Sequence, residues 1–312
     1  MARKDKIDVL CVQETHFTHT KVPKFAQQEY PTQYHSTHSS KSRGPSILIH
    51  KSLSFELLQV KKDSQGRYVI IHCTINDINY TIASVYSPNT NQRNFLHKVL
   101  SKIPSPQLQN LILCGDLNHI FDQTLDTTVP GDTRRQAALK PQCKAMTELL
   151  LEYNIYDSWR TTHPNVREYT HHSRAHKTSS RIDHILIAAH LLTSMIDCTI
   201  GDLTWSDHAP VRLTLQDKFP FRGTSPWKLH DSLLFDDSFK NTLEKEIKLY
   251  FDTNYTPQTQ PQNVWLAHKA VIRGLIISRA AYLKRKARDE YTTLLKKLRD
   301  QTNAHLLSPS TA

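Results

Sequence analysis

The chain has 312 residues, of which 40 are Lys or Arg and 29 are Asp or Glu, so its formal net charge is +11. This length allows either one large domain with an appendage or two domains. A hydrophobic content of 38% is enough for a packed core, which excludes a wholly disordered chain. No apolar run approaches the roughly 20 residues of a membrane helix. Because no signal-peptide stretch follows the charged N-terminus, we expect an intracellular protein that is not secreted.

Short strands dominate the first two thirds of the chain. Apolar or alternating runs predict strands at 7–12, 46–49, 68–75, 80–86, 111–114, 182–187, 196–200 and 211–215. The turn at 76–79 predicts a hairpin. Apolar side chains at helical spacing predict helices at 94–103 and 134–153. Many strands with a few helices between them indicate a layered α/β domain, in which two sheets pack face to face with helices outside.

The composition changes near residue 219, where the strand signals stop. We therefore expect two parts, 1–218 and 219–312, the second built from helices at 237–251 and about 263–300. Residues 221–312 hold 15 Lys and Arg against nine Asp and Glu, a net charge of +6. A basic run, Lys284, Arg285 and Lys286 followed by Arg288, belongs to the second helix. Such a run is either a solvated helix face or a surface for the phosphates of a nucleic acid.

The cysteines and histidines show no spacing that is specific for a metal site. The five cysteines are an odd number and form no CxxC pair, which favours reduced thiols in the core. The 18 histidines include two close groups, His16 with His19 and His171 with His172. Neither group has an HExxH spacing or a Cys partner, so we interpret most of these histidines as surface or packing residues.

Four short segments place acidic or amide groups directly after apolar strands, at 12–16, 115–118, 181–184 and 206–208. A carboxylate at the end of a buried strand is held rigidly at the edge of the sheet, where several such ends can converge. Oxygen ligands of this kind suit Mg²⁺, which binds one or two carboxylates together with substrate phosphates. In an extended segment Asp116 and Asn118 would share one face, so that one activates a water and the other orients a phosphate oxygen.

Asp207 and His208 are neighbours in sequence, so in an extended backbone their side chains would point to opposite sides. Asp207 would then be unable to orient the ring of His208, and Asp183 is a candidate for that role. A protonated His208 beside a phosphate would stabilise the negative charge of the transition state. Asp116 is a suitable general base for a water. Taken singly, these patterns are also typical of turns and solvated loops.

Six segments in a fixed order resemble the motifs of the endonuclease/exonuclease/phosphatase superfamily. They are Gln13-Glu14-Thr15-His16, Val85-Tyr86-Ser87-Pro88-Asn89, Gly115-Asp116-Leu117-Asn118, Glu168-Tyr169-Thr170, Arg181-Ile182-Asp183-His184 and Ser206-Asp207-His208. The resemblance covers residues 7 to about 215. It is strongest to the apurinic-like endonuclease domain of LINE-type, non-LTR retrotransposons, which is related to exonuclease III. The segments 227–234 and 264–274 resemble the helical region that follows this domain in such elements.

The resemblance implies a four-layer α/β/β/α sandwich with a helical C-terminal extension. It implies dependence on Mg²⁺, with Mn²⁺ as an alternative, and phosphodiester hydrolysis that leaves a 3′-hydroxyl. The implied metal-binding residues are Glu14, Asp116, Asn118, Asp207 and His208. The implied catalytic residues are Tyr86, Asp116, Asn118, Asp183, Asp207 and His208. Substrate contacts are expected from Thr170 and Ser206 and from the basic run Lys284, Arg285 and Lys286.

One departure from the family concerns its first strand. In the family, a strand that carries a metal-binding Asn precedes the glutamate, whereas the first Asn of this chain is Asn76. We therefore expect the first strand of the fold to be missing, so that the domain is truncated at its N-terminus. The loss would expose backbone hydrogen-bonding groups and weaken metal binding.

Three functions follow from these observations. The first is a Mg²⁺-dependent endonuclease of retrotransposon type that nicks DNA. The second is an inactive fragment that binds DNA only, and the third is a repair enzyme of the apurinic/apyrimidinic endonuclease or 3′–5′ exonuclease III type. The expected partner is double-stranded DNA, with RNA as a second ligand for the basic helix and no membrane contact. We expect a monomer in the nucleus or cytoplasm.

Overall fold

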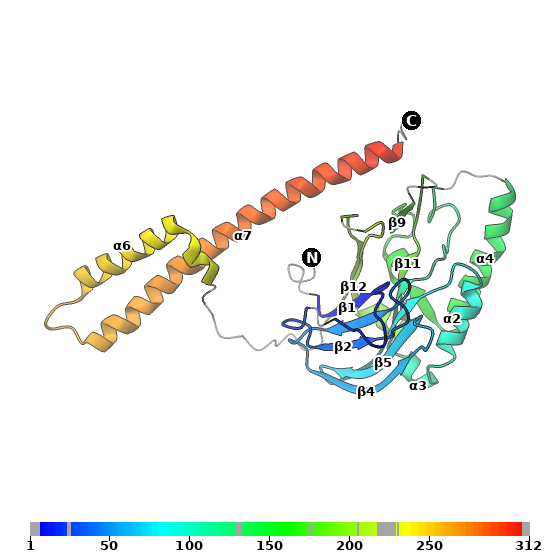
Figure 1. The fold of residues 1–312 in the computed structure, drawn as a ribbon, viewed down its shortest axis with the longest axis horizontal. Coiled ribbons are helices and arrows are strands. Elements are labelled where there is room, and N and C mark those ends of the chain that lie inside the picture. The colour runs from blue at the N-terminus through cyan, green and yellow to red at the C-terminus, as the bar shows by residue number, and fades with distance from the viewer. Residues whose placement is uncertain are drawn as a thin grey trace. The chain divides into compact units, whose positions relative to one another are not determined.

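The computed structural model describes residues 7–23, 26–128, 133–173, 175, 177–204, 206–216, 229 and 231–307, with backbone only at 133–138, 299 and 302–307. The chain forms two compact units, Met1–Arg222 and Gly223–Ala312 (Figure 1). The predicted boundary between residues 218 and 219 lies outside the described residues, and so do 227 and 228 of the tail motif. Each unit is described by itself below.

A six-stranded sheet forms the centre of the first unit. Its strands follow the order β4 (Phe55–Lys62), β5 (Tyr68–Ile75), β6 (Ile78–Tyr86), β7 (Leu111–Asp116), β11 (Asp183–Ala188) and β8 (Ile155–Asp157). Only β6 and β7 run parallel. The crossover between them carries α2 (Gln92–Leu100) and α3 (Ser105–Leu108). The predicted hairpin joins β5 to β6, and its turn residues Asn76 and Asp77 have the positive φ angles of 47° and 64° that a type I′ turn requires.

Helices α2 and α4 (Thr133–Glu152) cover one face of this sheet (Figure 1). The core under them contains Leu96 and Val99 from α2 and Met146, Leu149 and Leu150 from α4, all buried against apolar side chains of β5, β6, β7 and β11. The apolar side chains whose helical spacing predicted α4 therefore include its buried face. Both helices end within three residues of their predicted limits.

The opposite face of the six-stranded sheet packs on a second layer of strands. One part is a three-stranded antiparallel sheet with the order β1 (Val9–Val12), β3 (Ser46–Ile49) and β2 (Thr32–His35). Its core contains Ile47 and Ile49 against Val69, Ile71 and Ile82. The other part is the ladder of β12 (Met195–Ile200) and β13 (Val211–Leu215). The domain is thus the predicted α/β sandwich.

Within the described residues, β1 pairs only with β3, and β13 pairs only with β12. Both strands therefore have one edge without a ladder partner among those residues. The expectation that the first strand of the family's fold is missing stays a prediction.

Several short elements were not expected from the sequence. They are β2, β4, β8, β9 (His171–Ser173), β10 (Thr178–Ser180), α3, α5 (Ser158–Thr162) and the 3₁₀ helix η1 (Ala189–Ser194). Strand β4 lies at the edge of its sheet, and most of its residues are exposed, so it lacks the apolar alternation of a half-buried strand. Helix α5 begins at the cap Asp157 and contacts both β11 and β12.

The second unit consists of η2 (Asp231–Phe235) and two helices, α6 (Asp237–Asn254) and α7 (Pro261–Leu307), which extend the predicted ranges (Figure 1). Phe239 of α6 packs against Ile272 and Ile276 of α7, as expected for the apolar face of α6. Lys284, Arg285 and Lys286 are exposed on α7. Among the described residues, no helix combines the length and the hydropathy needed to cross a membrane.

Candidate active site

Three site residues lie side by side at the end of three neighbouring strands. Tyr86 of β6 pairs with Asp116 of β7, and Asp116 pairs in turn with Asp183 of β11. Side chains of directly paired residues lie on the same face of a sheet. The strand register therefore places a phenol and two carboxylates in one row, although Tyr86 and Asp183 are 97 positions apart in the sequence.

Asp116 and Asn118 are close, although not for the predicted reason. Strand β7 ends at Asp116, and Asn118 has a left-handed φ of 47° instead of an extended backbone. Its backbone N–H donates to Oδ1 of Asp116 at 2.8 Å, and its Nδ2 donates to Oδ2 of Asp116 at 3.2 Å and to the carbonyl of Ser87 at 2.9 Å. A tight turn that the aspartate caps, not the strand period, brings the two side chains together.

Gly115 explains how β7 approaches β6 at this point. Its φ is 141°, and a Cβ atom on it would lie 2.0 Å from the carbonyl oxygen of Val85. Any side chain would therefore push β7 away from β6 directly beside Asp116.

Glu14 approaches the row from the second layer of strands. It follows β1 and has a φ of 52°, a backbone conformation that is uncommon outside glycine. The neighbouring Gln13 donates from Nε2 to Oγ of Ser84 at 3.1 Å, which ties this segment to β6. Burial raises the pKa of Tyr86, and so does a hydrogen bond between its side chain and that of Glu14. Glu14 and Tyr86 are thus in direct contact.

His208 is held by Asp183, as the sequence suggested. Its Nδ1 donates to Oδ2 of Asp183 at 2.8 Å. Burial alone would lower the pKa of His208, but this hydrogen bond and the charges of Asp183, Asp116 and Asp207 outweigh it and raise the pKa to about 9. The imidazole is therefore positively charged at neutral pH.

Thr170 holds the backbone on both sides of the pair formed by Asp183 and His208. Its side chain is completely buried, and its Oγ1 accepts hydrogen bonds from the backbone N–H groups of Ile182 at 3.1 Å and Asp183 at 3.0 Å. Its carbonyl accepts a hydrogen bond from Ala209, close to His208. Because Thr170 is buried, it cannot contact a substrate directly, as the resemblance had implied. It acts by holding the backbone beside Asp183.

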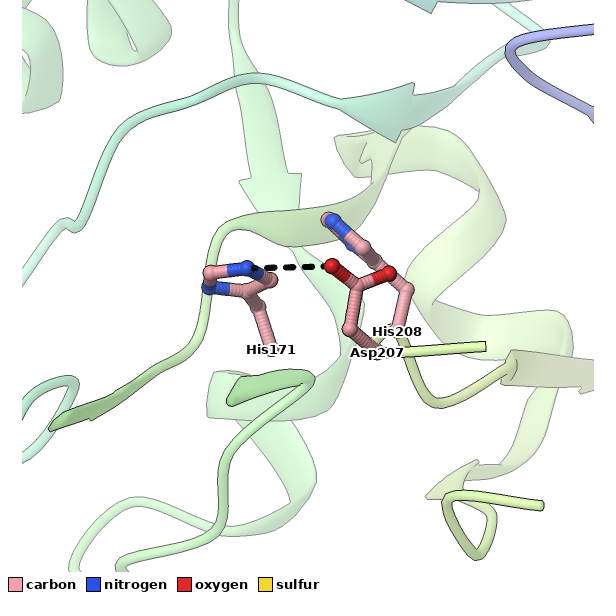
Figure 2. A group of neighbouring side chains, drawn as sticks. All are labelled: His171, Asp207 and His208. Atoms are coloured by element: carbon pink, nitrogen blue, oxygen red, sulfur yellow. Dashed lines mark ion pairs between the residues drawn. The ribbon is translucent and has the colours of Figure 1, made fainter. Parts of the chain in front are cut away.

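Asp207 does not diverge from His208 as an extended backbone would require. Residues 206–208 form a bend, in which Oγ of Ser206 donates to Oδ1 of Asp207 at 3.3 Å and accepts from the N–H of His208 at 3.1 Å. Figure 2 shows the carboxylate of Asp207 between the rings of His171 and His208. His171, interpreted from the sequence as a surface or packing residue, is part of the site region.

The site concentrates negative charge. Burial raises the pKa of Asp116 to about 7, and the charges of Asp183 and Glu14 add to this effect, while the hydrogen bond from Asn118 and the charge of His208 oppose it. A cation would relieve the cost of ionising Asp116, which burial and two neighbouring carboxylates impose. The oxygen-rich donor set around Asp116 suits Mg²⁺ or Mn²⁺, so the residues present fit a divalent cation.

A buried ion-pair network lies behind Asp183, and sequence reasoning missed it. Arg181, 1% exposed, donates from Nε and Nη2 to Asp126 at 2.9 and 3.0 Å and from Nη1 to Asp157 at 2.6 Å. Its backbone N–H donates to the carbonyl of Asp126. Nδ1 of His184 lies 3.2 Å from Oδ2 of Asp157 and 3.0 Å from Nη1 of Arg181. Because Arg181 and His184 flank Asp183 in sequence, the network fixes the start of β11.

Arg67 is a second residue that the sequence did not indicate. Its guanidinium carbon lies 5.7 Å from the ring centroid of Tyr86, and its Nη1 donates to the carbonyl of Tyr86 at 3.4 Å. Burial and the charge of Arg43 lower the pKa of Arg67. No local motif marks it, because it follows a turn and comes to the site through the pairing of β5 with β6.

Comparison with known proteins identifies the family to which this arrangement belongs. The family model described as endonuclease/exonuclease/phosphatase matches residues 1–208. A protein of transposon TX1 from Xenopus laevis, named as an uncharacterized 149 kDa protein, is 26% identical over 209 residues, which are 65% of this chain and only 15% of that protein. The DNA repair nuclease APEX1 of Danio rerio is 25% identical over 242 residues, 68% of this chain and 74% of its own length.

The solved structures include similar folds. The AP endonuclease LMAP from Leishmania major superposes with a TM-score of 0.54 at 17% identity, covering 69% of this chain and 80% of that one. This likeness shows the sandwich fold. The family model covers about two thirds of the chain and includes Glu14, Asp116, Asp183 and His208. The chain belongs to the endonuclease/exonuclease/phosphatase family.

Proposed function

We propose that this chain is an endonuclease that hydrolyses a phosphodiester bond of double-stranded DNA and leaves a 3′-hydroxyl, with Mg²⁺ as its cofactor and Mn²⁺ as an alternative. The observation that carries the proposal is the pairing of a buried carboxylate, Asp116, with a charged imidazole, His208, that is held by Asp183. The names of two relatives, a DNA repair nuclease and a transposon protein, support DNA as the substrate.

Asp116 suits the role of general base. A base is most effective when its pKa lies near the working pH, and without a bound cation the pKa of Asp116 is about 7. The N–H and the side-chain amide of Asn118 hold both of its oxygens in place. The carboxylate can therefore accept a proton from a water that attacks the phosphorus, while Asn118 orients that carboxylate.

His208 supplies positive charge for the phosphate. Its Nδ1 is taken by Asp183, which leaves Nε2 as the nitrogen that can face a phosphate oxygen. A fixed positive group at this place stabilises the negative charge that grows on the phosphate during attack. Tyr86, in contact with Glu14 and Arg67, offers a hydroxyl donor at the same edge of the sheet.

The divalent cation would be held by oxygen atoms of Glu14, Asp116, Asn118 and Asp207. His208, which the resemblance implied as a further ligand, uses Nδ1 for Asp183 and carries a proton at neutral pH, so its role here is to face the phosphate. When bound, it supplies Lewis-acid stabilisation of charge on the phosphate and its leaving oxygen. The remaining work falls to the side chains described above, which bind, orient and transfer protons.

The choice between a transposon-type nickase and a repair enzyme rests on the substrate. A transposon protein and a repair nuclease are similarly distant from this chain. We favour the nickase because the sequence continues into the basic helix α7, where Lys284, Arg285 and Lys286 are exposed and suited to phosphates of DNA or RNA. A DNA substrate makes the nucleus the proposed location, with the cytoplasm as the alternative, and the proposed state is a monomer.

Plasmid relaxation tests the function. The wild-type chain should convert supercoiled to nicked plasmid with Mg²⁺ and stop when the cation is chelated. Asp116→Ala and His208→Ala should each lower the rate at least about 10²-fold while DNA affinity stays nearly unchanged. Nicking at the wild-type rate by both variants would assign the activity to a contaminant, and DNA binding without nicking by the wild type would establish the inactive fragment.

Duplex substrates separate the remaining alternatives. Intact, T-rich and abasic duplexes of equal length should be compared under the same conditions. Cleavage of all intact duplexes, strongest at a preferred sequence, would support the nickase. Cleavage confined to the abasic site, or stepwise loss of nucleotides from the 3′ end, would assign the chain to the repair type.

A further inference from the structure

We propose that His171, Asp207 and His208 form a site for a borderline transition metal of the Zn²⁺ class, and that this ion blocks the proposed active site. The three residues are brought together by an isolated antiparallel bridge between His171 and His208. A backbone hydrogen bond of 3.1 Å from His172 to Asp207 strengthens this junction. One potential ligand atom from each of the three side chains lies within 4.8 Å of the others (Figure 2).

Each ligand atom is already aimed by a neighbour. His208 uses Nδ1 for Asp183, so Nε2 is its metal-binding nitrogen, and a carboxylate behind a ligating imidazole is the usual support of a metal site. Asp207 uses Oδ1 for Ser206, and its Oδ2 lies 3.9 Å from Nε2 of His171. The rings of His171 and His208 lie 4.6 Å apart between centroids, tilted by 46°.

The donor set selects the class of metal. Two imidazole nitrogens and one carboxylate oxygen suit Zn²⁺, whereas Mg²⁺ prefers oxygen ligands alone. Bonds of about 2.0–2.2 Å place tetrahedral ligand atoms roughly 3.5 Å apart. The present separations need a closure of about 1 Å. The side chains of His171, Asp207 and His208 are 24%, 66% and 31% exposed, so they have room for this movement and for a water as fourth ligand.

The site overlaps the proposed catalytic set, and this consequence rests on the proposed function. A zinc ion on Nε2 of His208 would occupy the nitrogen that otherwise faces the phosphate. Zinc should therefore inhibit nicking, and His171 is the residue that adds this sensitivity, because only two of the three ligands remain without it.

Direct zinc binding tests the site without relying on activity. The full chain should be titrated with Zn²⁺ in competition with a chromophoric chelator, beside His171→Phe and the control His190→Gln, which changes an exposed histidine on η1. We expect the wild type and the control to bind zinc equally, and His171→Phe to lose one equivalent or to bind it at least about tenfold more weakly. Thermal unfolding of each variant without zinc shows that all three are folded. Equal zinc binding by wild type and His171→Phe would overturn the proposal.

Inhibition is measured in the plasmid assay, as the zinc concentration that halves each variant's own zinc-free rate. His171→Phe should require at least about tenfold more zinc than the wild type or the control. Zinc binding that depends on His171 in a chain without nicking would leave the site standing and overturn the proposed nuclease. Nicking with the same zinc sensitivity in all three proteins would leave the nuclease standing and overturn the regulatory role of the site.

Discussion

His208 and Asp183 form a hydrogen bond of 2.8 Å between Nδ1 and Oδ2, although Asp183 begins β11 and His208 lies outside the named strands, ahead of β13. The bond fixes the orientation of the imidazole and keeps it protonated, because the carboxylate raises the pKa of His208. Asp183 also lies directly across from Asp116 in the sheet. The same residue therefore sets the charge of the proposed phosphate-binding group and contributes to the raised pKa of the proposed base.

Asp183→Asn should remove both effects. The pKa of His208 should fall towards 6.5, since an amide no longer stabilises the imidazolium, and nicking should fall at least about 10²-fold. Histidine ring resonances followed by NMR against pH measure the first effect, and plasmid relaxation the second. Asp197→Asn, an exposed aspartate on β12, is the control. An unchanged pKa of His208 in Asp183→Asn would show that the hydrogen bond does not set its charge.

Thr170 provides a test of support without substrate contact. Thr170→Val keeps the shape of the side chain but removes the acceptor of two backbone N–H groups, so we expect a loss of about 1–3 kcal/mol in the free energy of unfolding. Nicking should fall with it, because the backbone of Asp183 is no longer held. Thr170→Ser keeps the hydroxyl and should behave nearly as the wild type in urea unfolding and in activity. Equal stability of the Val and Ser variants would remove the supporting role.

The ion-pair network around Arg181 predicts a loss of stability in acid. Burial alone would raise the pKa of Asp157, but hydrogen bonds and charges from His184 and Arg181 outweigh it and hold the pKa well below the ordinary value of 3.8. The folded state therefore favours the ionised carboxylate. The resulting stability is fully present above about pH 4 and is lost as the pH falls towards the folded pKa.

Asp157→Asn should cost about 3–5 kcal/mol in the free energy of unfolding at pH 7, because it leaves part of the buried charge of Arg181 uncompensated. Below pH 4 its stability should fall less steeply than that of the wild type. Urea unfolding across pH 3–7 measures both quantities. Glu148→Gln, which removes an exposed i,i+4 pair with Lys144, is the matched control and should cost less than about 0.5 kcal/mol. Parallel acid profiles for wild type and Asp157→Asn would contradict the prediction.

The sequence predicted those parts of the fold that local chemistry determines. Strand β5 was predicted to the residue, because both faces of Tyr68–Ile75 are largely buried and most of its residues are apolar. The edge strand β4 was missed, because its exposed residues, Glu56 and Lys62 among them, do not need to alternate. A buried strand has a pattern of apolar residues that the sequence shows, whereas an exposed edge strand can pair through its backbone without such a pattern.

The residues of the site also divide into those that the local sequence predicted and those that it did not. Asp116 lies at the end of β7 as predicted, whereas Asp183 begins β11 instead of following an apolar strand. Asp183 was nevertheless a sequence-based candidate for the partner of His208. The left-handed turn at Asn118 and the bend at Asp207 were not predicted, because each depends on a backbone angle that the residue type only permits. His171 was missed because a bridge between distant segments brings it to His208. Contacts between segments that are distant in the sequence could not be predicted from a single sequence.

The basic run on α7 gives the last prediction. If Lys284, Arg285 and Lys286 contact phosphates, replacing all three with Glu should weaken duplex DNA binding at least tenfold in low salt. It should also reduce the slope of log affinity against log salt by about 2.7, since each phosphate contact contributes about 0.9. The matched control reverses three exposed lysines of α6, Lys240, Lys245 and Lys248, which changes the net charge equally. Equal losses of affinity in both variants would show that overall charge, not the position of the run, causes the effect. A wild-type affinity that barely changes with salt would show that the run is a solvated helix face.

The same titration with a single-stranded RNA of equal length decides whether the helix prefers RNA, because a pure phosphate surface should bind single strands with the shallower slope of about 0.7 per contact.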